Sequence, residues 1–141
     1  MNTEDKLANL ARIGHIKPEA FDAKEFDGLL RGAQARLQDA RNTALSPESR
    51  FDLAYNAAHS LCLAAMRRAG YRPEKRFTVF QTLPHTLGLG PEVWRVLDDC
   101  HNRRNVAEYE GNWDADYETI LKDLLLATDK VNAALATPTA P

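Results

Sequence analysis

A polar patch interrupts the apolar stripe of the segment 91–111. Val93, Leu97 and Cys100 recur at helical spacing, and the next step of four residues lands on Arg104. Burying an unpaired guanidinium is costly, so Arg104 must meet a carboxylate, line a wet cleft or lie at a subunit interface. Its neighbours on the same helix are an imidazole, an amide, a carboxylate and a phenol, supplied by His101, Asn105, Glu108 and Tyr109.

The groups in this patch have complementary chemistry. Arg104, His101 and Tyr109 combine with the other two residues into one dense polar patch of acid, amide, imidazole, phenol and guanidinium, which makes this helix the candidate functional centre of the chain. The candidate substrate-binding residues here are Asn105 and Glu108. A purely structural alternative is an ion pair between Arg104 and Glu108, one helical turn apart.

A second polar stripe lies on the segment 47–69, where Asp52, Asn56 and His59 follow one another at spacings of four and three. In a helical bundle this stripe could face the first patch, which makes these three residues further candidates for substrate binding. The alternative is a partly exposed polar edge in which His59 is hydrogen-bonded locally.

Metal and cofactor chemistry are not expected. A di-iron bundle needs repeated Glu-x-x-His pairs, whereas Asp98 and His101 form a single Asp-x-x-His pair. No phosphate-binding glycine loop is visible either. The two cysteines, Cys62 and Cys100, have no histidine at zinc-finger spacing and fall at apolar helix positions, so we expect buried free thiols.

Helical patterns account for most of the chain. Asp22 and Ser46 read as helix caps, and Gly70 reads as a stop signal. The expected helices span residues 3–13, 22–44, 46–69, 90–111 and 114–135, and the Pro- and Gly-rich segment 71–90 should hold a broken short helix. No strand-like alternation longer than about four residues appears. The predicted fold class is all-α, a bundle of four main helices plus short helices, with the helix of residues 46–69 at its centre.

The composition bounds the organisation of the chain. With 141 residues, of which 44% are hydrophobic and 27% charged, it suits a single globular domain over residues 1–135. Residues 136–141 should form a disordered tail. The N-terminal residues contain no apolar signal segment, and no window reaches the roughly 20 apolar residues that cross a bilayer. We therefore expect no membrane association and a cytoplasmic location.

The charge of the chain limits how it could contact nucleic acid. Its formal net charge of −2 lacks the basic field of a protein that coats RNA or DNA, so any RNA contact must be local. Basic residues do gather in two places. One is the pair Arg103 and Arg104, and the other consists of Arg67, Arg68, Arg72, Lys75 and Arg76. The ordinary interpretation of such groups is a solvated face.

Two segments resemble domains of the HEPN superfamily. Residues 50–59 read Arg-Phe-Asp-Leu-Ala-Tyr-Asn-Ala-Ala-His and are similar to the family's Tyr-containing, Ala-rich second helix. Residues 104–109 read Arg-Asn-Val-Ala-Glu-Tyr and resemble the Arg-x-x-x-x-His signature in its Arg-Asn form. The second segment lies on the penultimate long helix, where the family places its signature.

The resemblance implies a helical homodimer in which the signature helices of two subunits line a shared cleft, often acting as a metal-independent endoribonuclease. Many relatives are toxins neutralised by a nucleotidyltransferase partner. Arg104 would hold the scissile phosphate, while the residue at the histidine position would act as acid or base. This chain has Tyr109 there, and Gly111 where the family has a later tyrosine. A phenol with a pKa of about 10 is a poor general base but can donate a hydrogen bond to phosphate, and His101 is an alternative proton donor.

The residues leave more than one function open. The first is an RNA-cleaving or formerly cleaving HEPN-like protein. The second is a non-catalytic module whose cleft binds a nucleotide or a partner protein such as a nucleotidyltransferase. A helical adaptor without a ligand, with Arg104 in a structural ion pair, is the third.

Overall fold

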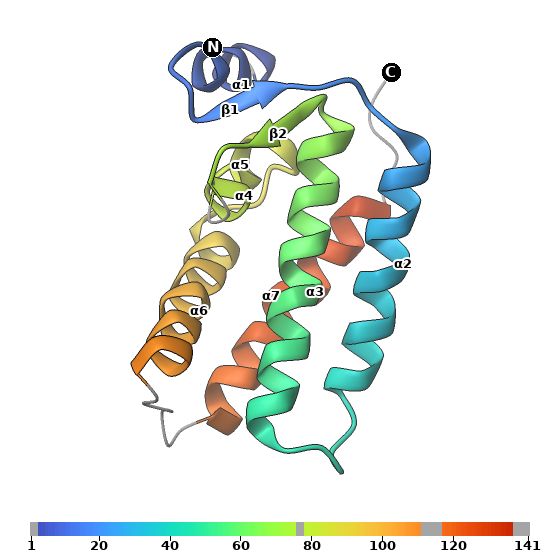
Figure 1. Cartoon of the computed structure of the whole chain (residues 1–141), viewed down its shortest axis with the longest axis vertical. Helices are drawn as coiled ribbons and strands as arrows, with labels where there is room; N and C mark the ends of the chain where they lie inside the picture. The colour runs from blue at the N-terminus through green and yellow to red at the C-terminus, as the bar shows by residue number, and fades with distance from the viewer. Residues whose placement is uncertain (1–2, 76–77, 111–116, 137–141) are drawn as a thin grey trace.

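The chain forms a bundle of long helices, seen in the computed structural model of Figure 1. The structure describes residues 3–75, 78–110 and 117–136, with side chains for 5–75, 78–106 and 117–136. Within these ranges the long helices are α2 (Ala23–Ala40), α3 (Pro47–Arg68), α6 (Pro91–Glu110) and α7 (Tyr117–Ala136). The short elements are α1 (Thr3–Arg12), β1 (Ile16–Pro18), β2 (Tyr71–Pro73), α4 (Thr78–Gln81) and α5 (Leu83–Thr86). The predicted all-α class with four main helices is confirmed.

The predicted caps start the helices. The Asp22 carboxylate accepts the backbone N–H groups of Lys24 and Glu25 at the start of α2, and the Ser46 hydroxyl accepts that of Ser49 at the start of α3. After α3, Gly70 adopts a φ of +91°, a conformation that favours glycine.

The predicted extension of α2 to Ala44 is wrong. The helix ends at Ala40, whose carbonyl accepts the Arg50 Nε–H at 2.8 Å. The Asn42 side chain then accepts the Ala44 N–H, which starts the turn into α3. Side chains therefore satisfy backbone groups that a longer helix would have paired.

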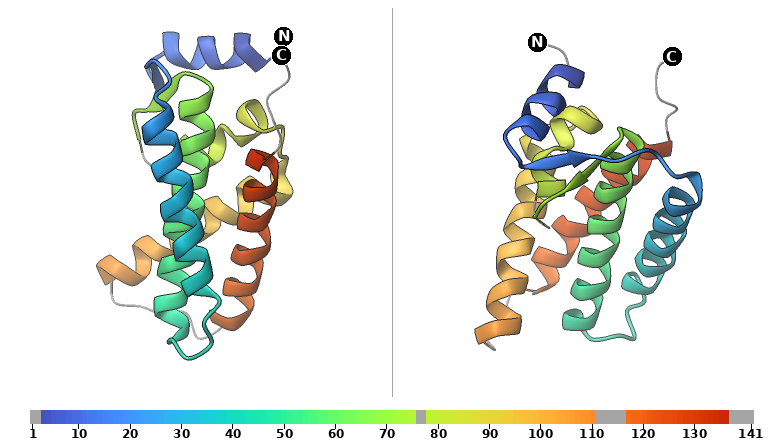
Figure 2. Two further views of the ribbon diagram at one scale, coloured as in Figure 1. Left: turned by 90° about the vertical axis from the view of Figure 1, so that its right-hand side faces the viewer. Right: turned by 45° about the horizontal axis from the view of Figure 1, so that its top comes forward.

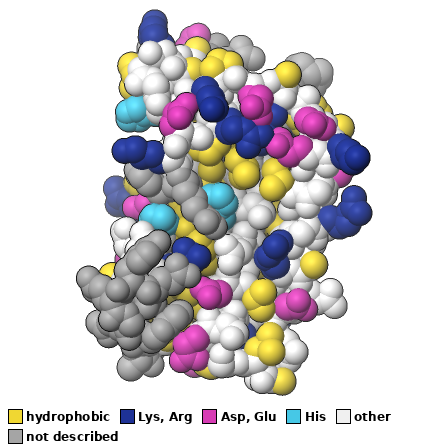
Figure 3. Space-filling model, viewed as in Figure 1, with side chains coloured by type: hydrophobic (Ala, Val, Ile, Leu, Met, Phe, Trp, Pro, Cys, Tyr) yellow, Lys and Arg dark blue, Asp and Glu magenta, His cyan; other side chains and the backbone are white. Residues whose placement is uncertain are grey.

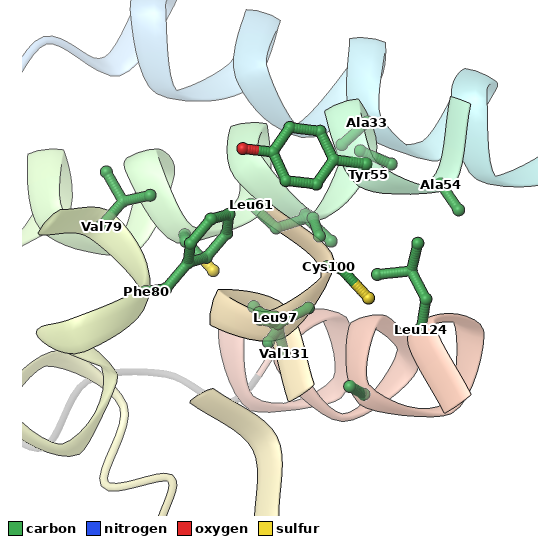
Figure 4. Packing of buried hydrophobic residues seen from close by; sticks show 14 of the residues in the cluster. Ala33, Ala54, Tyr55, Leu61, Val79, Phe80, Leu97, Cys100, Leu124 and Val131 are labelled. Carbon is green, nitrogen blue, oxygen red and sulfur yellow. The ribbon is translucent and has the colours of Figure 1, made fainter. Parts of the chain in front are cut away.

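Helix α3 lies at the centre of the bundle, as predicted. It packs against α2 and α7 and also meets α6 (Figures 1 and 2). Its buried face alternates large and small side chains, which lets its neighbours approach closely. The fully buried members of this face include Phe51, Ala54, Tyr55, Ala58, Leu61 and Cys62. Figure 4 shows how Tyr55 and Leu61 meet side chains of α4, α6 and α7 in the core.

One pair of strands was not predicted. β1 pairs antiparallel with β2, with Lys17 opposite Arg72. Three-residue strands are too short to show alternation in the sequence. The pairing joins the connection after α1 to the chain that leaves α3, and it buries Ile16 to 1% exposure.

The interpretation of Arg67 as part of a solvated basic face is wrong. Its side chain is buried, and Nε donates to the Glu25 carboxylate at 2.6 Å. The terminal nitrogens donate to the carbonyls of Glu19, Ala20 and Tyr71 at 2.9, 2.6 and 3.2 Å. A Glu19 carboxylate oxygen lies 3.3 Å from the guanidinium as well. Four hydrogen bonds and a second carboxylate thus surround the guanidinium, which is the condition for burying it.

Two further members of this basic group, Arg72 and Arg68, are also engaged. Arg72 bridges the carboxylates of Glu19 and Glu25 at about 2.6 Å, and Arg68 donates to the Leu135 carbonyl at 3.2 Å. Hydrogen bonding to Arg72 is the main reason why the pKa of both carboxyl groups lies below its ordinary value. We call Arg67, Arg72, Glu19 and Glu25 the clasp, because they tie the connection before α2 to the end of α3.

Several sequence predictions fall outside this description. The predicted end of one helix at residue 111, the predicted start of the next at residue 114, and the tail residues 137–141 are not among the described residues. Across the part of the chain that is described, no helix is long and apolar enough to cross a membrane.

Candidate functional site

Helices α3 and α6 place the two polar stripes against each other. The buried residues Val93, Leu97 and Cys100 fix the rotation of α6, so its next turn directs His101 and Arg104 toward α3. Figure 3 shows histidine, basic and acidic side chains gathered between α3 and α6 on one face of the molecule. We call Asp52, Tyr55, His101, Arg104 and Asn105 the polar seam.

His101 is held at both ring nitrogens. Its Nδ1 lies 2.7 Å from the Tyr55 hydroxyl, and its Nε2 lies 3.2 Å from the amide nitrogen of Asn105. Because an amide nitrogen is only a donor, Nε2 accepts from Asn105, and the neutral ring then donates its Nδ1–H to the Tyr55 oxygen. The imidazole is thereby fixed in orientation and in tautomer.

Arg104 lies between a carboxylate and an aromatic ring. Its side chain is 18% exposed, and Nε is 3.9 Å from an Asp52 carboxylate oxygen. The guanidinium carbon lies 5.2 Å from the centroid of the Tyr55 ring, within the range of a cation–π interaction. We expected this arginine to meet a carboxylate, line a wet cleft or lie at a subunit interface. Among the described residues it meets a carboxylate, that of Asp52 on α3.

Tyr55 connects the whole seam and was missed as a functional residue. The sequence placed it only on the apolar face of its helix, and it is indeed fully buried. Its hydroxyl nevertheless holds His101 while its ring faces Arg104. The available signal was the phenol itself, since a buried tyrosine hydroxyl usually finds a hydrogen-bond partner.

The remaining members of the second stripe lie at the edge of the seam. Asn56 turns its amide back to the Asp52 carbonyl at 2.9 Å, within the same helix. The His59 ring packs edge-on against Phe80 of α4, with centroids 6.0 Å apart, and Phe80 also contacts the Tyr55 ring at 5.9 Å. His59 therefore lies beside the Phe80 ring, which in turn packs against Tyr55 of the seam. The side chains of Glu108 and Tyr109 are not among the described residues, so their predicted place in the site stays a prediction.

The neighbouring Arg103 has a different environment. It pairs with Asp99 one turn earlier on α6, with 2.8 Å between Nε and the carboxylate. Its side chain is 39% exposed, twice the exposure of Arg104. The two adjacent arginines thus differ in burial and in partner, which makes Arg103 a natural control.

Burial weakens the two described thiols as nucleophiles. The free thiols of Cys62 and Cys100 are buried, as predicted, and burial raises the pKa of both, that of Cys100 to about 12. A thiol with a raised pKa is a weak nucleophile. Within the described ranges, no group of three or more His, Cys, Asp or Glu side chains is arranged to hold a metal ion.

Fold and site together define a helical bundle with one partly buried arginine–histidine seam. No protein-family model matches the chain, and no curated protein or solved structure is significantly similar to it.

Proposed function

We propose that the polar seam binds a phosphate-bearing ligand, an RNA or a nucleotide, in a HEPN-like domain. The observation that carries this proposal is the setting of Arg104 on the seam between α3 and α6, where its side chain is 18% exposed and its guanidinium lies 5.2 Å from the centroid of the Tyr55 ring. A phosphate that reaches the exposed part of this guanidinium would receive charge-assisted, parallel hydrogen bonds from it.

The other seam residues suit the same ligand. The Tyr55 ring lies within cation–π distance of the guanidinium, which helps to preorganise Arg104 for a bidentate contact. The amide of Asn105 and the edge residues Asn56 and His59 supply further donors for phosphate or base edges. Asp52 is the group that a bound phosphate must displace from Arg104, or that accepts a sugar hydroxyl beside it.

Within this proposal, binding stands ahead of cleavage. Both nitrogens of His101 are engaged, so the ring would have to release Asn105 before it moved a proton to or from substrate. The position that matches the HEPN histidine holds Tyr109, a weak base at neutral pH. Any toxin-type endoribonuclease activity would be metal-independent, with Arg104 on the scissile phosphate and Tyr109 or His101 as proton donor.

The binding proposal is tested with adjacent arginines. Fluorescence anisotropy with short single-stranded RNAs and with nucleotides, in EDTA, should show binding that Arg104→Ala weakens at least tenfold, as loss of a charge-assisted contact predicts. Arg103→Ala removes the same charge from the next position and should change the affinity less than threefold. Equal losses in both variants would mean a diffuse charge effect and would contradict a site at Arg104.

A third variant distinguishes between two roles of Arg104, a phosphate clamp and a structural ion pair with Asp52. Asp52→Asn keeps the shape of the side chain and releases Arg104, so it should raise the affinity for RNA or nucleotide if Arg104 is a phosphate clamp. A purely structural pair predicts the reverse pattern: neither wild type nor Asp52→Asn binds, and both Asp52→Asn and Arg104→Ala lower the free energy of unfolding in urea.

Cleavage is tested by rebuilding the signature. Tyr109→His restores the Arg-x-x-x-x-His pattern, and a gain of RNA cleavage in EDTA would show that the scaffold is competent. Tyr109→Phe removes only the hydroxyl and should abolish any cleavage in which that group donates a proton.

A non-catalytic module that binds a partner protein, such as a nucleotidyltransferase, is the second candidate function. The observation in its favour is the departure from the signature at Tyr109 and Gly111. Under this proposal neither wild type nor Arg104→Ala binds RNA detectably. Arg104→Ala should instead reduce co-purification with the product of an adjacent nucleotidyltransferase gene.

A further inference from the structure

A pocket separate from the polar seam is lined by residues from the end of α2, the start of α3 and the helix α7. Figure 2 shows the arrangement of these three helices. Its volume is about 290 Å³, close to the lower limit of small-ligand pockets. Arg41 at the end of α2, Arg50 on α3 and Lys122 on α7 supply cations from three different elements. None of the polar-seam residues lines it.

Arg50 is held in this pocket by a backbone carbonyl. The residue is partly buried, and its Nε donates to the Ala40 carbonyl at 2.8 Å, which holds the side chain across the end of α2. Among the described residues the two terminal nitrogens of Arg50 meet no acceptor. A fixed guanidinium with four remaining N–H donors is prepared for an anion.

The other charges leave the pocket wall positive. Arg41 is paired with Asp129 on α7, whereas Lys122 forms no ion pair with any described residue. Glu118 is the second acid on the wall, so three cations face two carboxylates. Because Arg41 and Asp129 neutralise each other, the remaining charges on the wall are the two positive charges of Arg50 and Lys122 and the negative charge of Glu118.

Apolar surface lies directly beside these cations. Leu121 and Leu125 line the pocket, and Leu126 is 54% exposed, which is unusual for a leucine on a helix of the bundle. An inorganic anion would use the cations and leave this surface wet. A molecule with an anionic head and a short hydrocarbon body would cover both.

We propose that this pocket binds a small amphipathic anion, a carboxylate or phosphate carried on a short apolar body. Arg50 binds the anionic head with its terminal nitrogens, Lys122 adds a second positive charge, and the leucines of α7 contact the body. The site is independent of the proposed RNA or nucleotide site at Arg104.

The proposal is tested by titrating the protein with hexanoate and hexyl phosphate while following the leucine methyl and Arg50 Nε–H signals by NMR. We expect saturable shifts at the pocket with at least one of the two, and the tighter of them identifies the head group. Hexanol, which lacks the charge, and inorganic phosphate, which lacks the body, should each bind at least fivefold more weakly. Equal binding of hexanol would overturn the anionic part of the proposal, and equal binding of phosphate the apolar part.

Variants locate the charges. Lys122→Gln should weaken hexanoate binding about threefold, as for one exposed charge, and Arg50→Gln about tenfold. Lys130→Gln removes the same charge from α7 outside the pocket and should have no effect, whereas Asp129→Asn frees Arg41 and should strengthen binding. Arg104→Ala should retain it. A pocket that binds such anions should do so with a Kd of roughly millimolar or tighter. The proposal is overturned if no saturable shift appears up to about 50 mM ligand. It is also overturned if Lys122→Gln and Lys130→Gln have equal effects.

Discussion

At the scale of single residues, Tyr55 decides the geometry of the polar seam. One side chain fixes the imidazole through its hydroxyl and faces the guanidinium with its ring. The hydroxyl and the ring can be separated experimentally, because Tyr55→Phe removes only the first. This makes the hydrogen bond at His101 measurable on its own.

Tyr55→Phe should lower the free energy of unfolding by about 1 kcal/mol, the usual cost of one lost hydrogen bond. It should also mix the tautomers of His101, because the Nδ1–H loses its acceptor; two-dimensional NMR of the ring nitrogens reports this directly. Tyr71→Phe is the matched control, since the Tyr71 hydroxyl has no partner among the described residues, and it should be neutral. A single unchanged tautomer in Tyr55→Phe would mean that Asn105 alone sets the ring.

The buried thiols predict a loss of stability at alkaline pH. Burial raises the pKa of Cys62 and Cys100 in the folded chain above the ordinary value of about 9. Because the pKa is raised on folding, each protonated thiol makes its full contribution to the free energy of unfolding below pH 9. This contribution is lost as the pH rises toward the pKa in the folded chain, which is about 12 for Cys100. Each thiol should cost about 1.4 kcal/mol per pH unit above 9. Urea unfolding at pH 8 and pH 10 should therefore show a smaller alkaline loss in Cys100→Ala than in wild type.

At the scale of elements, the clasp holds the N-terminal part of the chain on α3. Arg67 is buried with acceptors that come mainly from the connection before α2, 47 residues earlier in the case of Ala20. β1 and β2 pair directly beside it. The position of α1 and β1 therefore depends on charged groups as well as on apolar packing.

Removing one acceptor should release this connection. Glu25→Ala leaves the buried Nε–H of Arg67 without its carboxylate and should cost roughly 2–3 kcal/mol, less than a fully buried pair because Glu25 is partly exposed. Asp27→Ala, an exposed acid two residues along α2, should cost less than about 0.5 kcal/mol. Hydrogen exchange should rise selectively in β1 and β2 of Glu25→Ala. If both variants lost the same stability, the clasp would not be what holds the connection.

Acid should act on the same elements. The pKa of Glu19 and that of Glu25 are lowered, chiefly by hydrogen bonds to Arg72, so their contribution is complete above the ordinary value of about 4.5. It is lost as pH falls below that value toward the folded pKa. Exchange in β1 and β2 at pH 3, measured against pH 6, should rise more in wild type than in Glu25→Gln, which has no such carboxylate to protonate.

The elements also mark what sequence can and cannot predict. Caps at Asp22 and Ser46 and the stop at Gly70 act within a few residues, so the helix starts and the end of α3 were predictable. Arg67 looked like one member of a charged run because its acceptors are distant carbonyls, which leave no local pattern. Each polar stripe was likewise visible on its own helix. That the two stripes meet, through Tyr55, depends on how α6 is rotated against α3.

At the scale of the whole molecule, the seam and the pocket occupy different sides of α3. α6 lies on one side of α3 and carries part of the seam, whereas α2 and α7 pack against α3 elsewhere (Figures 1 and 2). The pocket is lined by residues of α2, α3 and α7 and by none from α6. Two ligands could therefore be bound without sharing a side chain. A self-association through α6 would affect only the seam.

The HEPN resemblance predicts such an association, a homodimer in which the signature helices of two subunits form one cleft. On α6 the exposed face next to Arg104 carries Val106, a large apolar side chain that is 39% exposed. Light scattering at micromolar concentration should give two chains per particle. Val106→Glu introduces a charge on this face and should shift the particle to one chain, because an unpaired charge is costly at an interface.

Leu126→Glu places the same charge on α7, on the side of the pocket, and serves as the control. If the shared cleft exists, this variant stays dimeric, and Val106→Glu loses affinity for RNA or nucleotide together with its dimerisation. Dissociation by Leu126→Glu alone would put the interface on α7 and leave each seam to a single subunit. A wild type that is strictly monomeric would remove the shared cleft altogether, since the seam of a single subunit would then have to bind the phosphate with its own residues alone.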